Sequence, residues 1–170
     1  MKKLTVLLTV AALLFSLMGG SALATGGNES SAESARPPAP TVGTPASGDG
    51  KTEVWLNGGL RALDATFEIT YASNSIIEYS SAFLRLGCQT NTSLTADTIT
   101  NYFEVQRWEN GSWVFYSSTS YSLSDASSYL CYWYKSVAHG YYYRIKTVHS
   151  AWRGAEYDTY LLYGNYIYVS

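Results

Sequence analysis

Proline, histidine and cysteine are scarce in this chain, and their scarcity excludes several kinds of site. All four prolines lie between residues 37 and 45, and none occurs in residues 51–170. The two cysteines and two histidines form no H-E-x-x-H, no C-x-x-C and no histidine pair four residues apart, which are the spacings typical of metal sites. A G-x-S-x-G sequence and a glycine-rich phosphate loop are also missing. The sequence therefore predicts no metal, no cofactor and no catalytic residue.

Charged side chains are few, and neither sign dominates. The chain has 11 Lys and Arg against 13 Asp and Glu. Loss of Lys2 and Lys3 with a leader would leave 9 against 13, a net charge of −4. Proteins that bind nucleic acid neutralise phosphates with Lys and Arg, so we expect no nucleic-acid partner.

One long apolar run is present, at the start of the chain. Met1-Lys2-Lys3 precedes an apolar run over residues 4–18, and an A-x-A site follows at Ala22 and Ala24. This is the order of a secretory signal, and the run is short for a membrane-spanning helix of about 20 residues. We expect a cleaved signal peptide over residues 1–24 and a secreted, extracellular protein with no membrane span after processing.

Composition divides the remaining chain in two. Residues 25–52 carry the prolines among Ser, Gly, Ala and Thr, a composition typical of a disordered linker. All 16 tyrosines and all 5 tryptophans follow in residues 53–170, which is enough for one domain with its own core.

Hydrophobicity in this domain alternates with a period of two, which is typical of β-strands. The runs predict an all-β, antiparallel β-sandwich of about seven or eight strands. An Asn110-Gly111 pair between two runs predicts a type I′ hairpin turn. The hairpin register places Trp108 opposite Trp113 and Val105 opposite Tyr116. The strand-like runs cover residues 66–71, 76–86, 101–108, 113–118, 128–134, 141–148, 157–163 and 166–169.

The two cysteines, Cys88 and Cys131, are both expected to face the core or lie close to it. In an exported protein an even number of cysteines favours a disulfide, and their separation of 43 residues would give about 4 kcal/mol in the loop-entropy model. Two buried thiols are the alternative.

The segment Gly140-Tyr141-Tyr142-Tyr143, which begins a strand-like run, resembles the late strand of immunoglobulin-like and fibronectin-type-III-like sandwiches. In those folds the tyrosine hydroxyl bonds back to the preceding corner, a role that Tyr141 or Tyr143 would take here. Residues 57–170 also resemble a loose group of short secreted proteins of Gram-positive bacteria with one β-sandwich domain. The resemblance implies a fold and assigns no catalytic or binding residue. A bridge between the cysteines would join neighbouring strands rather than the two sheets.

Aromatic side chains are the strongest functional signal. Tyr and Trp are enriched at interfaces because they combine apolar area with a polar group. If Phe103, Val105 and Tyr116 face the core, an outward patch follows that could stack on sugars or anchor a protein, although the tryptophans could instead lock the hairpin. Arg144 and Lys146 share another strand face that could contact an anionic partner. The candidate binding residues are therefore Trp108, Trp113, Phe115, Arg144 and Lys146.

These features favour a secreted, non-enzymatic binding or interaction module for a glycan or a surface protein. A secreted hydrolase of cell-wall or extracellular polymer is one alternative, and it would need a cleft with at least two groups from a small set. That set consists of Glu78, Glu104, Glu156, Asp158 and His149. A structural domain of a matrix or coat is the other alternative.

Overall fold

The computed structural model describes residues 36–41, 43, 50–56 and 66–170, which belong to one compact unit, Ala35–Ser170. The expected signal peptide over residues 1–24 and most of the expected linker lie outside the described residues. Within the described part of the chain, no helix is long and apolar enough to cross a membrane.

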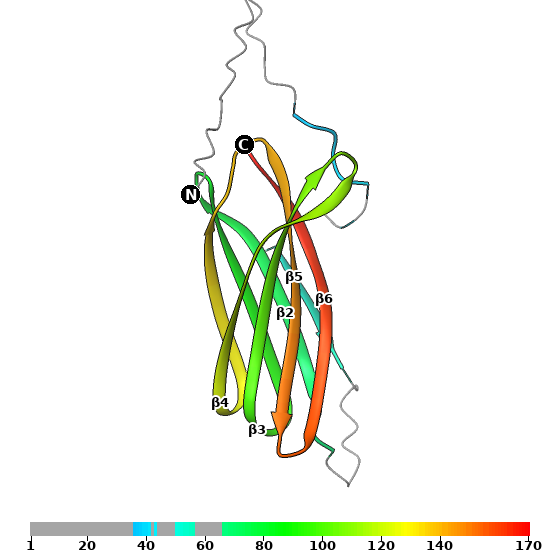
Figure 1. Ribbon diagram of the computed structural model, residues 1–170, viewed down its shortest axis with the longest axis vertical. Helices are drawn as coiled ribbons and strands as arrows, with labels where there is room; N and C mark the ends of the chain where they lie inside the picture. Colours follow the sequence, from blue (N-terminus) through cyan, green and yellow to red (C-terminus); the bar gives the residue numbers. More distant parts are fainter. Residues whose placement is uncertain (1–35, 42, 44–49, 57–65) are drawn as a thin grey trace, which may run out of the picture. The chain divides into compact units, whose positions relative to one another are not determined.

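The described residues form a single curled sheet of six antiparallel strands (Figure 1). The expected all-β, antiparallel architecture is therefore confirmed. The strand order is β1-β2-β3-β5-β6, and β4 pairs with β3 beside this path. The strands are β1 (Lys51–Trp55), β2 (Ile69–Ser80), β3 (Phe83–Glu109), β4 (Ser112–Ser136), β5 (Tyr141–Arg153) and β6 (Glu156–Val169). Because β1 begins at Lys51, strand structure starts two residues before the expected domain boundary.

The described strands number six because several expected runs join. Residues 101–108 lie within β3, which has 27 residues, and 113–118 and 128–134 both lie within the 25-residue β4. Irregular register between Asn91 and Ala96 lets β3 continue through a polar stretch that resembles a loop in sequence. The expected run over 76–86 is instead divided by a turn at Ala82, which has a positive φ of 60°.

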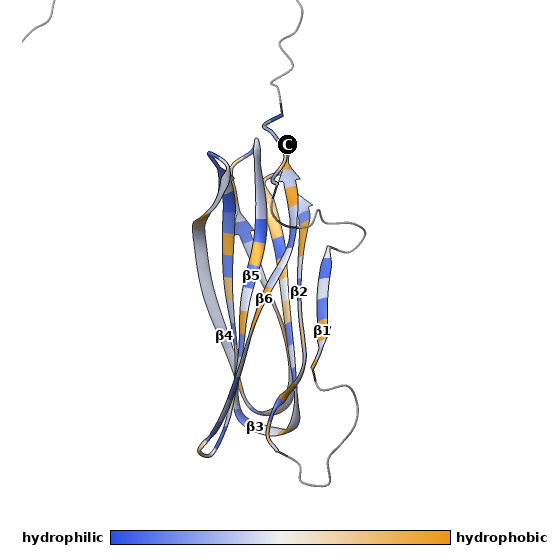
Figure 2. Cartoon of the chain, turned by 90° about the vertical axis from the view of Figure 1, so that its right-hand side faces the viewer, coloured by the Kyte–Doolittle hydropathy of each residue, from blue (hydrophilic) through white to orange (hydrophobic). Residues whose placement is uncertain are grey.

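The long β3 strand makes the sheet curl. Its first part pairs with β2 and its later part with β5, while β4 runs along its other edge. Figure 2 shows this curl from the side, with β1 at the margin of the sheet next to β2. The curl brings β2 against β5 and β6, so apolar side chains from both ends of the sheet meet.

The main core lies inside this curl. Leu84 and Leu86 from the first part of β3 pack in one cluster with Phe103 and Val105 from its later part. All four side chains are fully buried, so the alternation expected along β3 is confirmed at these positions. The other buried members are Ile76, Cys88, Val137, Tyr143, Ile145 and Val169.

The predicted hairpin turn is present at Asn110 and Gly111, which have φ values of 50° and 80°. Trp108 lies opposite Trp113, as expected. A register shift between Val105 and Gln106 then changes the pairing, so that Val105 lies opposite Ser117 and not Tyr116. The predicted register is therefore correct between this bulge and the turn, and it is wrong on the other side of the bulge.

A tyrosine closes the corner before β5. The Tyr143 hydroxyl donates a hydrogen bond of 2.9 Å to the carbonyl oxygen of Ala138. Of the two tyrosines that the resemblance offered for this role, Tyr143 makes the bond. Burial raises the pKa of its hydroxyl, so it remains a donor at neutral pH.

Cys88 and Cys131 lie directly opposite each other on β3 and β4. Both are free thiols in the structure, in contrast to the expected disulfide. Cys88 is fully buried and Cys131 packs against the same core. The expectation that both face the core is confirmed, and so is the expectation that they lie on neighbouring strands.

Candidate functional site

The five candidate binding side chains share one outward surface of the sheet. In the register, Gln106 of β3 lies between Phe115 of β4 and Arg144 of β5. Residues two positions apart on a strand point to the same side, so this row joins the hairpin tip to β5. The sequence suggested two separate patches, and the structure combines them. We call this surface the aromatic face, and it consists of Trp108, Trp113, Phe115, Arg144 and Lys146.

The two tryptophans of the aromatic face stack edge to face. Their ring centroids are 5.2 Å apart at an angle of 62°, and Trp113 also contacts Tyr166 of β6 at 5.8 Å. Both tryptophans are half-buried. The pair therefore fastens the hairpin to β6 and leaves part of its rings at the surface.

A segment before β1 covers the neighbouring part of the surface. The Arg36 guanidinium lies 4.3 Å from the Tyr168 ring centroid, and its Nε donates a 2.9 Å hydrogen bond to the Tyr142 hydroxyl. Pro40 is buried. At Gly43, an added Cβ would lie 3.3 Å from the Tyr166 ring. Figure 1 shows residues 36–41 in blue near the tip of the β3–β4 hairpin.

A chain of polar contacts crosses the centre of the aromatic face. Arg144 Nε donates to Gln106 Oε1 at 2.7 Å, and Gln106 Nε2 donates to Glu104 Oε1 at 2.6 Å. Lys146 Nζ completes the chain at 2.9 Å from Glu104 Oε2. These contacts fix the side chains in one arrangement, so a ligand would meet an ordered polar surface.

The two cations of the aromatic face have different surroundings. The hydrogen bond to Glu104 raises the pKa of Lys146, so this ion pair persists across the neutral range. Burial lowers the pKa of Arg144, whose guanidinium lies 4.7 Å from the Trp113 ring centroid and 5.0 Å from that of Tyr163. Arg144 thus connects the tryptophan pair to β6 through its contacts with two aromatic rings.

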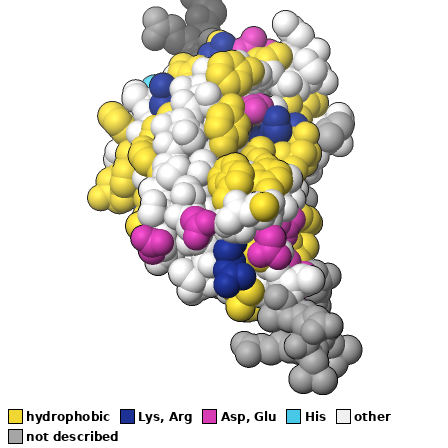
Figure 3. All heavy atoms as spheres, turned by 60° about the horizontal axis from the view of Figure 1, so that its bottom comes forward, with side chains coloured by type: hydrophobic (Ala, Val, Ile, Leu, Met, Phe, Trp, Pro, Cys, Tyr) yellow, Lys and Arg dark blue, Asp and Glu magenta, His cyan; other side chains and the backbone are white. Residues whose placement is uncertain are grey.

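Exposed apolar side chains continue from the aromatic face onto β6. Phe115 is 62% exposed and Tyr163 is 51% exposed, and both flank the polar contacts. Figure 3 presents the end of the sheet away from the β3–β4 hairpin, and there too apolar side chains in yellow gather in clusters between polar groups. Such mixtures of rings and polar groups mark interaction surfaces in soluble proteins.

His149, one of the groups that a hydrolase cleft would need, lies in the interior. It is fully buried on β5, with Nδ1 2.7 Å from the Thr90 hydroxyl and Nε2 2.9 Å from the Thr147 hydroxyl. Burial lowers its pKa to about 4, so the ring is neutral at pH 7. Cys88 Sγ lies 3.6 Å from Nδ1, and burial raises the pKa of this thiol. A neutral thiol and imidazole in this position form part of the core.

The carboxylates proposed for a hydrolase have separate partners. Glu104 pairs with Lys146, and Glu156 pairs with Arg153 at 3.6 Å. Asp158 accepts a 2.7 Å hydrogen bond from the backbone N–H of Ile69. Within the described ranges, no group of three His, Cys, Asp or Glu side chains could hold a metal ion.

Sequence reasoning missed the contacts of Arg36, since the prolines that follow it indicated a disordered linker. The available signal was an arginine beside a proline-rich run in a chain with many tyrosines.

No protein-family model matches the chain, and comparisons with curated proteins and with solved structures find no similar protein. Function must therefore be argued from the surfaces themselves.

Proposed function

We propose that this protein is a secreted binding module that recognises a glycan or a protein at the cell surface through the aromatic face. The observation that carries the proposal is the exposure of Phe115 and Tyr163 beside the ordered Arg144–Gln106–Glu104–Lys146 contacts. Exposed rings supply contact area at low entropic cost, and the fixed polar groups supply hydrogen bonds. The apolar leader sequence over residues 4–18 supports export.

The test is retention of the purified protein on insoluble cell-wall polysaccharide and on immobilised surface protein. Phe115→Ala and Tyr163→Ala remove exposed rings with little effect on the core, and each should lower retention about tenfold. Tyr79→Ala is the matched control, because Tyr79 is 61% exposed on β2, away from the aromatic face. Equal retention by all three variants and the parent protein would contradict the proposal.

A role in a matrix is a second candidate, and it is favoured by the edge of β4. Among the described strands, β4 pairs with β3 alone, which leaves the other edge of a 25-residue strand open. Residues 117–128 of this strand contain one charged side chain, Asp125, and no proline. Such edges can pair with a further strand. Sedimentation velocity over a range of protein concentrations would reveal assembly, and a monomer at every concentration would rule it out.

We further propose that the curled sheet is an immunoglobulin-like sandwich whose layers remain joined through β3 and β4, and that the chain is related to the short secreted β-sandwich proteins of Gram-positive bacteria. The buried cluster shared by β2, β3, β5 and β6 and the Tyr143–Ala138 hydrogen bond support this proposal. An experimental structure in which β2 and β6 do not face each other across that cluster would contradict it.

We also propose that Cys88 and Cys131 form a disulfide in the exported protein. Their direct pairing across β3 and β4 supports this, since paired residues on neighbouring strands lie within the Cα separation that a disulfide needs.

A further inference from the structure

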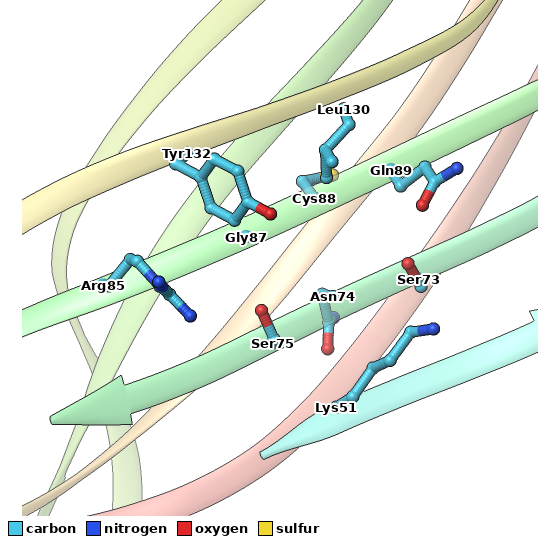
Figure 4. A pocket seen from close by; sticks show the side chains of 10 residues that line it. All are labelled: Lys51, Ser73, Asn74, Ser75, Arg85, Gly87, Cys88, Gln89, Leu130 and Tyr132. Atoms are coloured by element: carbon cyan, nitrogen blue, oxygen red, sulfur yellow. The ribbon is translucent and has the colours of Figure 1, made fainter. Parts of the chain in front are cut away.

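Another part of the outward surface of the sheet, formed by residues outside the aromatic face, carries an open groove. It has a volume of about 260 Å3 and lies over the outward side of β1, β2, β3 and β4 (Figure 4). The lining residues are Lys51, Ser73, Asn74, Ser75, Arg85, Gly87, Cys88, Gln89, Leu130 and Tyr132.

A glycine occupies an outward position near the start of β3, beside the groove. Gly87 lies between Ser75 of β2 and Tyr132 of β4 in one cross-strand row. A Cβ at Gly87 would lie 2.6 Å from Ser75 Oγ and 3.1 Å from Tyr132 Cε1, so these two side chains close over the glycine and any side chain there would push them apart. Glycine in a strand interior weakens the strand and often marks a place where a ligand or another chain approaches closely.

The groove is positively charged. Its lining includes Lys51 and Arg85 and no carboxylate. Lys51 pairs with Glu53, whereas Arg85 makes no ion pair with any carboxylate in the part of the chain that the structure describes. Arg85 can therefore offer its planar guanidinium to two oxygens of an incoming carboxylate.

The remaining groups of the groove suit a sugar ring. The Tyr132 ring is 46% exposed and forms one wall, with the Arg85 guanidinium 5.4 Å from its centroid. Ser75 contributes a hydroxyl from β2, and Gln89 contributes an amide from β3. A groove of about 260 Å3 has space for one sugar ring.

We propose that this groove binds a single carboxylate-bearing sugar residue of an acidic glycan. Arg85 pairs with the sugar carboxylate, Tyr132 contacts the C–H face of the ring, and Ser75 and Gln89 bind ring hydroxyls. Gly87 allows the Ser75 and Tyr132 side chains to approach each other over β3. This site is separate from the aromatic face, and it specifies a ligand chemistry that the proposed function leaves open.

The test is a titration of the purified protein with a short oligogalacturonide, followed by calorimetry and by amide chemical shifts at low ionic strength. The parent protein should bind, and the same oligosaccharide with its carboxyl groups reduced to alcohols should bind at least tenfold more weakly. Arg85→Gln should also weaken binding about tenfold. Gly87→Ala should weaken it to a similar extent, because the methyl group must displace the Ser75 and Tyr132 side chains.

Controls keep the result interpretable. Arg153→Gln removes an equally charged, exposed arginine on β5 and should leave oligogalacturonide binding unchanged. Thermal unfolding checks that Gly87→Ala remains folded, and Arg85→Gln tests the site independently of that variant. Absence of binding by the parent protein, or equal binding of the reduced oligosaccharide, would overturn the proposal. Equal competition by inorganic phosphate or by an acidic peptide would overturn the assignment to a sugar.

Because the aromatic face is tested by retention of Phe115→Ala, the two proposals can fail separately. Loss of retention in Phe115→Ala together with unchanged oligogalacturonide binding in Arg85→Gln would support the aromatic face and reject the groove. The reverse pattern would support the groove alone.

Discussion

The Nδ1 atom of His149 lies 2.7 Å from the hydroxyl of Thr90, a residue 59 positions earlier in the chain, and this contact joins β5 to the first part of β3 inside the core. Thr147 holds the other ring nitrogen at 2.9 Å, and Asn101 lies 2.5 Å from the Thr90 hydroxyl. The neutral imidazole is thus held by uncharged partners, and protonation would place a charge among them.

Acid should therefore destabilise the fold through His149. Its pKa is about 4 in the folded protein and about 6.5 when the chain is unfolded, so the unfolded state binds the proton more readily. The stabilisation is present above pH 6.5 and is lost as pH falls towards 4, at a cost of about 2 kcal/mol by pH 5. Urea unfolding at pH 7 and pH 5 measures this loss. The variant His149→Gln should show a flatter dependence between these values, and an unchanged slope would contradict the assignment.

The cysteine pair should be unreactive in the folded protein. Burial raises the pKa of both thiols, and Cys88 is 1% exposed, so little thiolate is available at neutral pH. We expect the reduced protein to react slowly with a thiol reagent until it is unfolded. If the disulfide forms, it forms during folding, when a disulfide donor accepts the two electrons and the two thiols release their protons.

Mass spectrometry checks this pair directly. Protein recovered from an oxidising secretion pathway should be lighter by two hydrogens than the same protein after reduction, and Cys131→Ser should abolish the difference. A native protein that reacts rapidly at both cysteines would contradict the burial argument, and one that stays reduced after export would contradict the disulfide.

Local signals in the sequence predicted local structure well. The Asn110-Gly111 turn and the alternation of Phe103 and Val105 are confirmed, because turn chemistry and the period of a strand depend on neighbouring residues. The length of β3 was not predicted, since residues 89–93 are polar and resemble a loop. In the structure Thr90 points inward to the imidazole of His149, a partner that only the completed fold supplies.

The candidate surfaces, too, could be predicted only where they depend on neighbouring residues and not on distant strands. The residues of the aromatic face were identified from residue type and strand face. That they form one surface around Gln106 depends on the pairing of β3 with β5, which the sequence did not predict. The groove was not predicted. Gly87 and Tyr132 are 45 positions apart, and neither residue alone indicates that they are neighbours.

Gly164 is expected to be intolerant of any side chain. It lies at a register shift between β5 and β6, and a Cβ there would be 2.3 Å from Asn74 Oδ1 and 2.4 Å from Ile145 Cγ2. Both neighbours are fully buried, so they cannot move without displacing the core. Gly164→Ala should lower the free energy of unfolding by about 3 kcal/mol or prevent folding.

Asn165→Ala, which removes only an exposed hydrogen bond to the Lys51 carbonyl, should lower the free energy of unfolding by less than about 1 kcal/mol. Denaturant unfolding compares the two, and equal costs would contradict the steric argument.

The segment that contains Arg36 should both stabilise the sheet and limit access to part of the aromatic surface. Arg36→Ala removes the contact with the Tyr168 ring and the hydrogen bond to the Tyr142 hydroxyl. Each contact is worth about 1 kcal/mol, so we expect the free energy of unfolding to fall by about 1 to 2 kcal/mol. Arg36→Lys keeps the charge but loses the planar group, and it should recover only part of this loss.

The same variant tests whether the segment competes with a ligand. If Arg36 holds the segment on β5 and β6, Arg36→Ala should increase the accessibility of Tyr142, which is 3% exposed in the parent protein. Retention on the ligand of the aromatic face should then rise, provided that the ligand extends from Trp113 towards Tyr168. Covalent labelling of tyrosines measures the first effect and the retention assay the second. Unchanged labelling of Tyr142 would show that Arg36 does not hold the segment in place, whereas increased labelling with unchanged retention would confine the ligand to the half of the face around Phe115 and Tyr163.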